Sequence, residues 1–102
     1  MSQYKVIVAD KARMMSGSHI RFLAQENPSA ARKTKANLLE AIRSLEKMPE
    51  RFPFLDENCT TRGKYRKMFV ETWYLILYQV KGTTVYVDYI VDCRQDYGWL
   101  VR

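Results

Sequence analysis

Residues 62–99 read RGKYRKMFVETWYLILYQVKGTTVYVDYIVDCRQDYGW and contain most of the β-forming sequence of the chain. The stretch opens with a dense basic run. It continues as three blocks rich in β-branched and aromatic residues, 64–70, 72–80 and 83–92, which is the composition of strands. Lys81-Gly82 separates the last two blocks and predicts a tight hairpin turn. We therefore expect this stretch to supply both the sheet and most of the charged chemistry.

Alternation along the last two blocks assigns their side chains to opposite faces of that sheet. In 72–80, one face receives Trp73, Leu75, Leu77 and Gln79, and the other receives Tyr74, Ile76, Tyr78 and Val80. In 83–92, the corresponding sets are Val85, Val87, Tyr89 and Val91 against Thr84, Tyr86, Asp88 and Ile90. Aromatic residues occur in these sets on both sides, so each face is expected to be covered or used for binding.

The N-terminal half predicts one strand and two helices. Residues 3–9 alternate as a short strand, and Asp10 is placed to cap the following helix, 11–26. Asn27-Pro28 then predicts the N-cap and first position of a second helix, 29–48, which forms an antiparallel hairpin with the first. The expected core residues are Ala12, Met14, Met15, His19, Phe22 and Leu23 in the first helix and Leu38, Leu39, Ile42, Leu45 and Met48 in the second.

One further segment and one histidine remain to be interpreted. Residues 49–58 hold two prolines and are expected to form an irregular link that Phe52, Phe54 and Leu55 pin to the core. His19 lies on the apolar stripe of its helix, and we interpret it as a packed structural histidine, because no catalytic partner is visible in the sequence.

The resulting order, β-α-α-β-β-β, predicts a small antiparallel α+β sheet with the helical hairpin on one face. The 102 residues suffice for one hydrophobic core, and no Gly/Ser-rich spacer or repeat interrupts them. We therefore expect one domain spanning residues 1–102.

Composition limits the classes of function. A net charge of +6 and a pI near 9.5 favour an acidic or polyanionic partner, although ordinary solubility charge explains them as well. No apolar run approaches the about 18 residues of a membrane span, so we expect a cytoplasmic protein that does not bind membranes. Cys59 and Cys93 are too few for a disulfide scaffold and, with one histidine, do not form a zinc motif. We expect neither metal nor cofactor.

The element order, together with the block WYLILYQVKGTTVYVDYIVDCRQD, resembles the RelE/ParE superfamily of toxins from bacterial type II toxin–antitoxin modules. The helical segment ENPSAARKTKANLLEAIRSLEKMPERFP is similar to the second helix and proline turn of that superfamily. This resemblance covers nearly the whole chain. It implies a cognate antitoxin that wraps the toxin, and one of two targets: DNA gyrase for ParE-like members, or mRNA in the ribosomal A site for RelE-like members.

The resemblance also implies site residues. Transferred position by position, Arg66, Arg94 and Tyr97 are the catalytic candidates of a metal-independent ribonuclease. Met68 and Leu75 stand where cleaving members carry lysine and arginine, and Leu100 stands near the usual aromatic acid or base. Because cations must stabilise the charge on the phosphate in the transition state, these replacements favour the ParE-like side.

The remaining basic and aromatic residues of the stretch are candidates for contact with nucleic acid or antitoxin: Arg62, Lys64, Lys67 and Trp99. Other interpretations stay open for these residues. Edge-strand cations discourage aggregation, Arg94 can pair with Asp92 or Asp96, and Tyr97 and Trp99 can pack the C-terminal tail on the sheet. Three functions follow as hypotheses: a gyrase-directed toxin, a ribosome-dependent endoribonuclease with a variant site, and an inactive relative that binds antitoxin.

Overall fold

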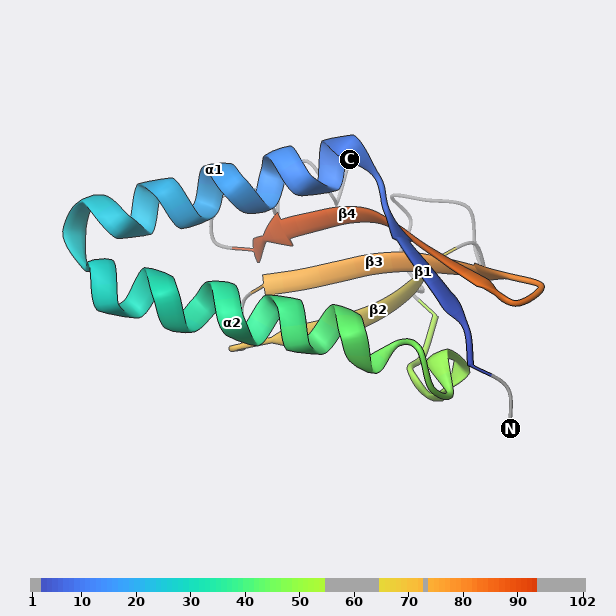
Figure 1. Ribbon diagram of the computed structural model, residues 1–102. Helices are drawn as coiled ribbons and strands as arrows, with labels where there is room; N and C mark the ends of the chain where they lie inside the picture. The colour runs from blue at the N-terminus through green and yellow to red at the C-terminus, as the bar shows by residue number, and fades with distance from the viewer. Residues whose placement is uncertain (1–2, 55–64, 73, 94–102) are drawn as a thin grey trace.

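The computed structural model describes residues 3–54, 65–72 and 74–93 of the 102-residue chain. The elements follow the predicted order: β1 (Lys5–Val8), α1 (Asp10–Glu26), α2 (Pro28–Ser44), the 3-10 turn η1 (Pro49–Arg51), β2 (Arg66–Val70), β3 (Tyr74–Lys81) and β4 (Thr84–Asp92). The two helices lie side by side as an antiparallel hairpin across one face of the sheet (Figure 1). The α+β class is therefore confirmed.

The sheet is mixed, with the order β1-β4-β3-β2. Strands β2, β3 and β4 are antiparallel as expected, but β1 runs parallel to β4, with Val6 opposite Val85. The expectation of a wholly antiparallel sheet is wrong at this edge, because β1 and β4 are joined by a long crossover through both helices and two strands, which permits parallel pairing. Helix α1 then continues along β4 beyond the end of β1 (Figure 1).

The helix ends follow the predicted signals at one junction and depart from them at two. Asn27 caps α2, its Oδ1 accepting from the Ala30 N–H at 3.0 Å, and Pro28 is the first helical residue. Asp10 is not a cap, because the Ala9 N–H bonds to the Val87 carbonyl and makes Ala9 the residue before the helix. Helix α2 ends at Ser44 rather than at residue 48.

The main core lies between the helices and the sheet. Its fully buried members include Ala12, Leu38, Leu45, Tyr74, Ile76, Tyr78, Val85, Val87 and Ile90. Four residues expected in the core are instead exposed, namely Met14, Phe22, Leu39 and Met48, with exposed fractions of 72%, 56%, 56% and 72%. The buried stripe of each helix is narrower than predicted, because only a narrow face of each helix can contact both the sheet and the other helix.

A β-bulge in β4 changes which side chains face the helices. Leu77 pairs with Tyr89 and Tyr78 with Val87, so Asp88 has no opposite residue on β3. One extra residue reverses the alternation beyond it. Ile90 therefore joins the main core, whereas Tyr89 and Val91 pack on the opposite face with Leu75, Leu77 and Tyr65. The predicted grouping of Tyr89 and Val91 with Val85 and Val87 is wrong for this reason.

The turn from β2 to β3 has an unusual backbone. Glu71 and Thr72 have φ angles of 53° and 75°, in the left-handed region that non-glycine residues rarely occupy. The turn shortens the predicted strand 72–80, since β3 begins at Tyr74. The hairpin from β3 to β4 is as predicted, with Gly82 at φ 62° as the first of two loop residues, where a type II′ turn favours glycine.

The link between α2 and β2 is irregular, as expected from its prolines. Phe52 packs against the main core, but Phe54 is 45% exposed and forms an isolated bridge with Arg66. Leu55 lies outside the described residues. In the part of the chain that is described, neither helix has the length and apolar character that crossing a bilayer requires.

We predict that Thr72→Gly stabilises the protein, because a left-handed conformation costs a β-branched residue about 1–2 kcal/mol that glycine avoids. The greater conformational entropy of glycine in the unfolded chain offsets part of this gain. The expected gain in the free energy of unfolding is about 1 kcal/mol, measured by urea denaturation. Thr83→Gly is the matched control, since Thr83 occupies the other hairpin loop without a positive φ angle. A Thr72→Gly protein no more stable than Thr83→Gly would contradict this interpretation of the turn.

Candidate partner-binding surfaces

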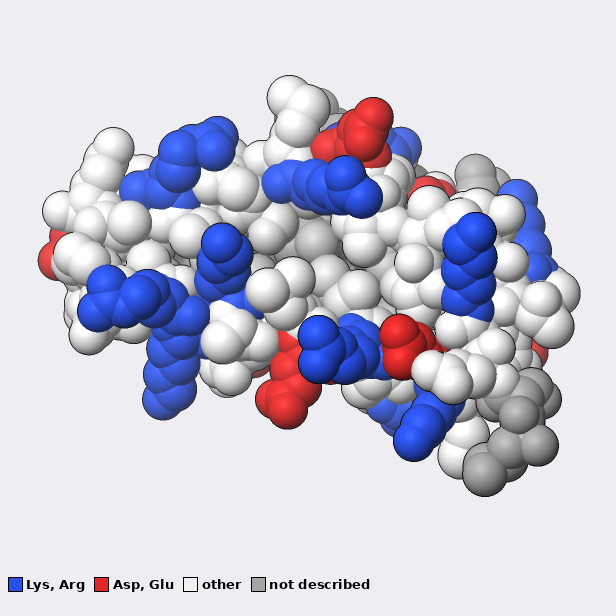
Figure 2. All heavy atoms as spheres, viewed as in Figure 1, with Lys and Arg blue, Asp and Glu red and all other residues white. Residues whose placement is uncertain are grey.

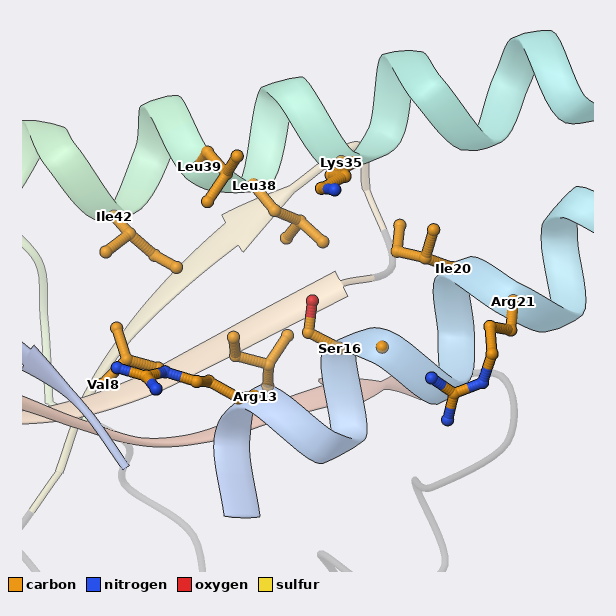
Figure 3. A pocket seen from close by; sticks show the side chains of 11 residues that line it. Val8, Arg13, Ser16, Ile20, Arg21, Lys35, Leu38, Leu39 and Ile42 are labelled. Carbon is orange, nitrogen blue, oxygen red and sulfur yellow. The ribbon is translucent and has the colours of Figure 1, made fainter. Parts of the chain in front are cut away.

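A groove of about 440 Å³ lies between α1 and α2, above the ends of β1 and β4. We call it the interhelical groove. Figure 3 shows Leu38 and Ile42 of α2 and Ile20 of α1 extending into it. Val8 and Ile90 complete its apolar lining, and the exposed Leu39 lies at its margin. The groove thus presents an apolar strip to a partner, of the kind that an amphipathic segment covers.

Small residues of α1 keep this groove open. Ser16 and Gly17 line it at the middle of α1, where larger side chains would fill the space. A Cβ atom built on Gly17 would lie 3.3 Å from Nη1 of Arg21, so even alanine would crowd that side chain. Glycine inside a helix costs about 1 kcal/mol relative to alanine. The residues that shape the groove are therefore ones with low helix propensity.

The rim of the interhelical groove is basic. Arg13 and Arg21 come from α1 and Lys35 from α2. Within the described ranges, none of the three forms an ion pair with a carboxylate. Figure 2 shows more lysine and arginine than acidic side chains over this helical face. An apolar strip between uncompensated cations fits an acidic amphipathic segment.

Arg66, the one catalytic candidate within the described residues, holds the link that precedes β2. Its Nη1 donates to the carbonyls of Phe52 at 2.7 Å and Glu50 at 3.2 Å. Its guanidinium also lies 4.0 Å from the centre of the Phe54 ring. These contacts give Arg66 a structural role, because its Nη1 donates to two main-chain oxygens of the same molecule.

The positions beside Arg66 do not form a cationic site. Lys67 lies on the opposite face of the sheet from Arg66, as the alternation predicted. Met68 is buried in the main core and Leu75 in the cluster on the other face, with exposed fractions of 7% and 3%. A cation at either position would lose its hydration without gaining an ion pair, so both positions are occupied by core residues.

Five sequence candidates cannot be placed. Arg62, Lys64, Arg94, Tyr97 and Trp99 lie outside the described residues, as do Cys59 and Leu100. His19 is 8% exposed, and its ring centre lies 6.1 Å from that of Tyr74, as expected of a packed histidine. Within the described ranges, no three histidine, cysteine or acidic side chains gather as metal ligands.

Two buried tyrosines, Tyr78 and Tyr65, organise polar contacts on opposite faces of the sheet. Burial raises the pKa of Tyr78 to about 12, although the nearby Arg66 and Arg51 cations oppose this shift. The Tyr78 hydroxyl donates to the Pro49 carbonyl at 2.5 Å and so ties β3 to η1. On the opposite face, burial and the Asp88 carboxylate raise the pKa of the Tyr65 hydroxyl, which donates to Asp88 at 3.1 Å.

The bulge residue Asp88 is the centre of this second set of contacts. Its carboxylate also accepts from Gln79 Nε2 at 2.8 Å. Lys11 Nζ lies 4.1 Å from the centre of the Tyr89 ring, and its hydrogen bond with Tyr89 raises the pKa of the Lys11 ammonium. These contacts hold α1 and the bulged segment of β4 together. The hydroxyls of Tyr65 and Tyr78 and the carboxylate of Asp88 thus all form hydrogen bonds within the protein.

Sequence reasoning placed the candidate site on the strands and missed the interhelical groove. Arg13 and Arg21 are eight positions apart on α1, with Ser16, Gly17 and Ile20 between them on the same face. That mixture of small, apolar and basic residues is a signal for a groove, but Lys35 joins it only when the second helix is in place.

Comparison with known proteins agrees with this fold. Residues 6–97 match the family model described as the ParE toxin of the type II toxin–antitoxin system parDE. The chain therefore belongs to the ParE toxin family, as its resemblance to the RelE/ParE superfamily implied. A chain from the chromosomal ParDE toxin–antitoxin system of P. aeruginosa has a similar fold, with a TM-score of 0.71 and 15% identity. The alignment covers 88% of this chain and 96% of that one. No curated protein matches the sequence.

We predict that Tyr78→Phe reduces the loss of stability at alkaline pH. The folded pKa of about 12 lies above the ordinary value near 10, so the hydroxyl ionises first in the unfolded chain. The contribution of the Tyr78 hydroxyl to the free energy of unfolding is complete below pH 10 and is lost as the pH rises toward 12. Urea unfolding across that range should therefore show a shallower decline for the variant. An equal decline in both proteins would contradict the assignment of this shift to Tyr78.

Proposed function

We propose that this toxin arrests growth by inhibiting DNA gyrase, and that a cognate antitoxin neutralises it in the cytoplasm. Membership of the ParE family supports a toxin of a type II toxin–antitoxin system. The observation that carries the choice of target is the burial of Met68 and Leu75. Both positions carry cations in cleaving relatives, so their burial as apolar side chains counts against ribonuclease chemistry.

The chemistry of RNA cleavage makes that observation informative. A ribonuclease of this kind must remove the 2′-OH proton, stabilise charge on the phosphate and protonate the leaving oxygen. Arg66 Nη1 donates to two main-chain carbonyls, and Lys67 lies on the other face of the sheet. The described cations of β2 therefore do not converge on one point where a phosphate would sit. A toxin that acts by binding a protein has no such requirement.

The interhelical groove is the proposed binding site for the antitoxin. Its apolar lining suits the nonpolar side of an amphipathic segment, and Arg13, Arg21 and Lys35 suit flanking carboxylates. The exposed Leu39 extends the apolar surface at the margin, where a bound segment would cover it. An acidic antitoxin segment would thereby bury apolar area and neutralise part of the +6 charge.

We predict that expression without antitoxin halts growth, induces DNA-damage signalling and leaves transcripts intact. Growth curves, a damage-response reporter and mapping of transcript ends measure these three outcomes in one culture. Co-expression of the antitoxin should restore growth. Cuts in mRNA at the ribosomal A site, without the damage response, would contradict the gyrase target and support the ribonuclease alternative. Normal growth throughout would indicate an inactive relative.

A further inference from the structure

A second groove lies on the other side of α2, between that helix and β2, with a volume of about 350 Å³. We call it the α2–β2 groove. Ala41, Phe52 and Met68 contribute apolar surface, whereas Glu40 and Glu71 are its charged residues. We propose that this groove binds a segment of the toxin's target protein that presents an arginine or lysine beside an apolar side chain. The inference rests on the proposed function, and it identifies a target-docking surface distinct from the interhelical groove.

Glu71 is held in place without an ion-pair partner among the described residues. Its carboxylate accepts from Thr34 Oγ1 at 2.8 Å and from Asn37 Nδ2 at 2.6 Å. Both donors are neutral, and no described lysine or arginine forms an ion pair with Glu71. The hydrogen bonds fix the position of the carboxylate, but the charge still favours a cation from outside. Such an oriented, half-buried charge binds a complementary cation without the cost of ordering its own side chain.

Glu40 adds a second charge at the same groove. Glu40 is exposed and lies three positions after Asn37, about one helical turn further along α2. The two residues therefore share the side of α2 that faces β2. Arg51 stacks on Phe52 near the other side of the groove, and its guanidinium lies 4.6 Å from the centre of the Phe52 ring. Its donors already bond to the carbonyls of Lys47 and Met48, so Arg51 does not neutralise the two glutamates.

The apolar and main-chain surroundings favour a polypeptide segment as the occupant. Phe69 lines the groove and is 55% exposed, although it belongs to a strand. Strand β2 is the edge of the described sheet. The Lys67 N–H points away from β3 and bonds to the Pro53 carbonyl. Main-chain N–H and C=O groups point in the same direction at every second residue of a strand, so those of Phe69 also point away from β3. A partner segment can therefore cover Phe69, approach the edge of the described sheet and direct a cation at Glu71.

The two grooves take different partners because their charges are opposite. Lys35 and Ile42 face the interhelical groove, whereas Asn37 and Ala41 face the α2–β2 groove. An acidic segment is favoured by the first groove and repelled at the second. An arginine fits the second groove especially well, because its planar guanidinium can stack on a phenyl ring while it bonds a carboxylate in two places.

Charge changes at the α2–β2 groove test this inference. Glu40→Lys alters an exposed side chain with no hydrogen bond to lose among those described, and Glu71→Gln removes the charge while keeping an acceptor for one donor. Glu26→Lys is the matched control, since Glu26 is an exposed glutamate at the end of α1, outside both grooves. All proteins are compared for growth arrest, binding to purified DNA gyrase and binding to the antitoxin, with thermal unfolding as a check on folding.

We expect Glu40→Lys and Glu71→Gln to bind gyrase at least about tenfold more weakly and to arrest growth less, with antitoxin binding and folding retained. Glu26→Lys should behave as the wild type. Equal gyrase binding and growth arrest in all four proteins would overturn the inference while leaving the proposed function intact. Wild-type arrest without gyrase binding would overturn the proposed target. Loss of that arrest in both Glu40→Lys and Glu71→Gln, but not in Glu26→Lys, would still support the groove.

Discussion

The packing of α2 on the sheet is the constraint on which the rest of the structure depends. Leu38 and Leu45 are almost fully buried against the main core, and Thr34 and Asn37 bond to Glu71 at the turn between β2 and β3. These contacts fix both the position and the rotation of the helix. With its rotation fixed, α2 separates a groove with a basic rim from one with acidic residues. Helix α2 therefore forms one wall of both grooves, while α1 and the β2–β3 turn supply the remaining charges.

Much of the fold could be predicted from local patterns, because those patterns act over a few residues. The Asn27-Pro28 junction, the apolar period of α2 and the Gly82 hairpin each identified an element correctly. The parallel pairing of β1 and the bulge at Asp88 could not be predicted in this way. The first depends on the path of the whole chain, and the second is a single inserted residue that leaves the β-forming composition unchanged.

Prediction of the candidate site was less complete for a physical reason. Arg66 was predicted as a catalytic candidate, but its contacts depend on carbonyls of the link preceding β2, whose approach no spacing rule predicts. Arg13, Arg21 and Lys35 resemble ordinary surface charges until two helices bring them to one rim. The replacements at Met68 and Leu75 were visible in the sequence, and their burial explains why apolar residues suit those positions.

The most direct test of whether the interhelical groove is the antitoxin site is to measure the affinity of two toxin variants for the antitoxin. These variants are Lys35→Glu and Lys33→Glu. The two lysines are neighbours on α2, but only Lys35 lines the groove. We expect Lys35→Glu to weaken binding roughly tenfold and to reduce its dependence on salt, whereas Lys33→Glu changes affinity less than about twofold. Equal losses in the two variants, or no loss in either, would contradict the assignment of the antitoxin to this groove.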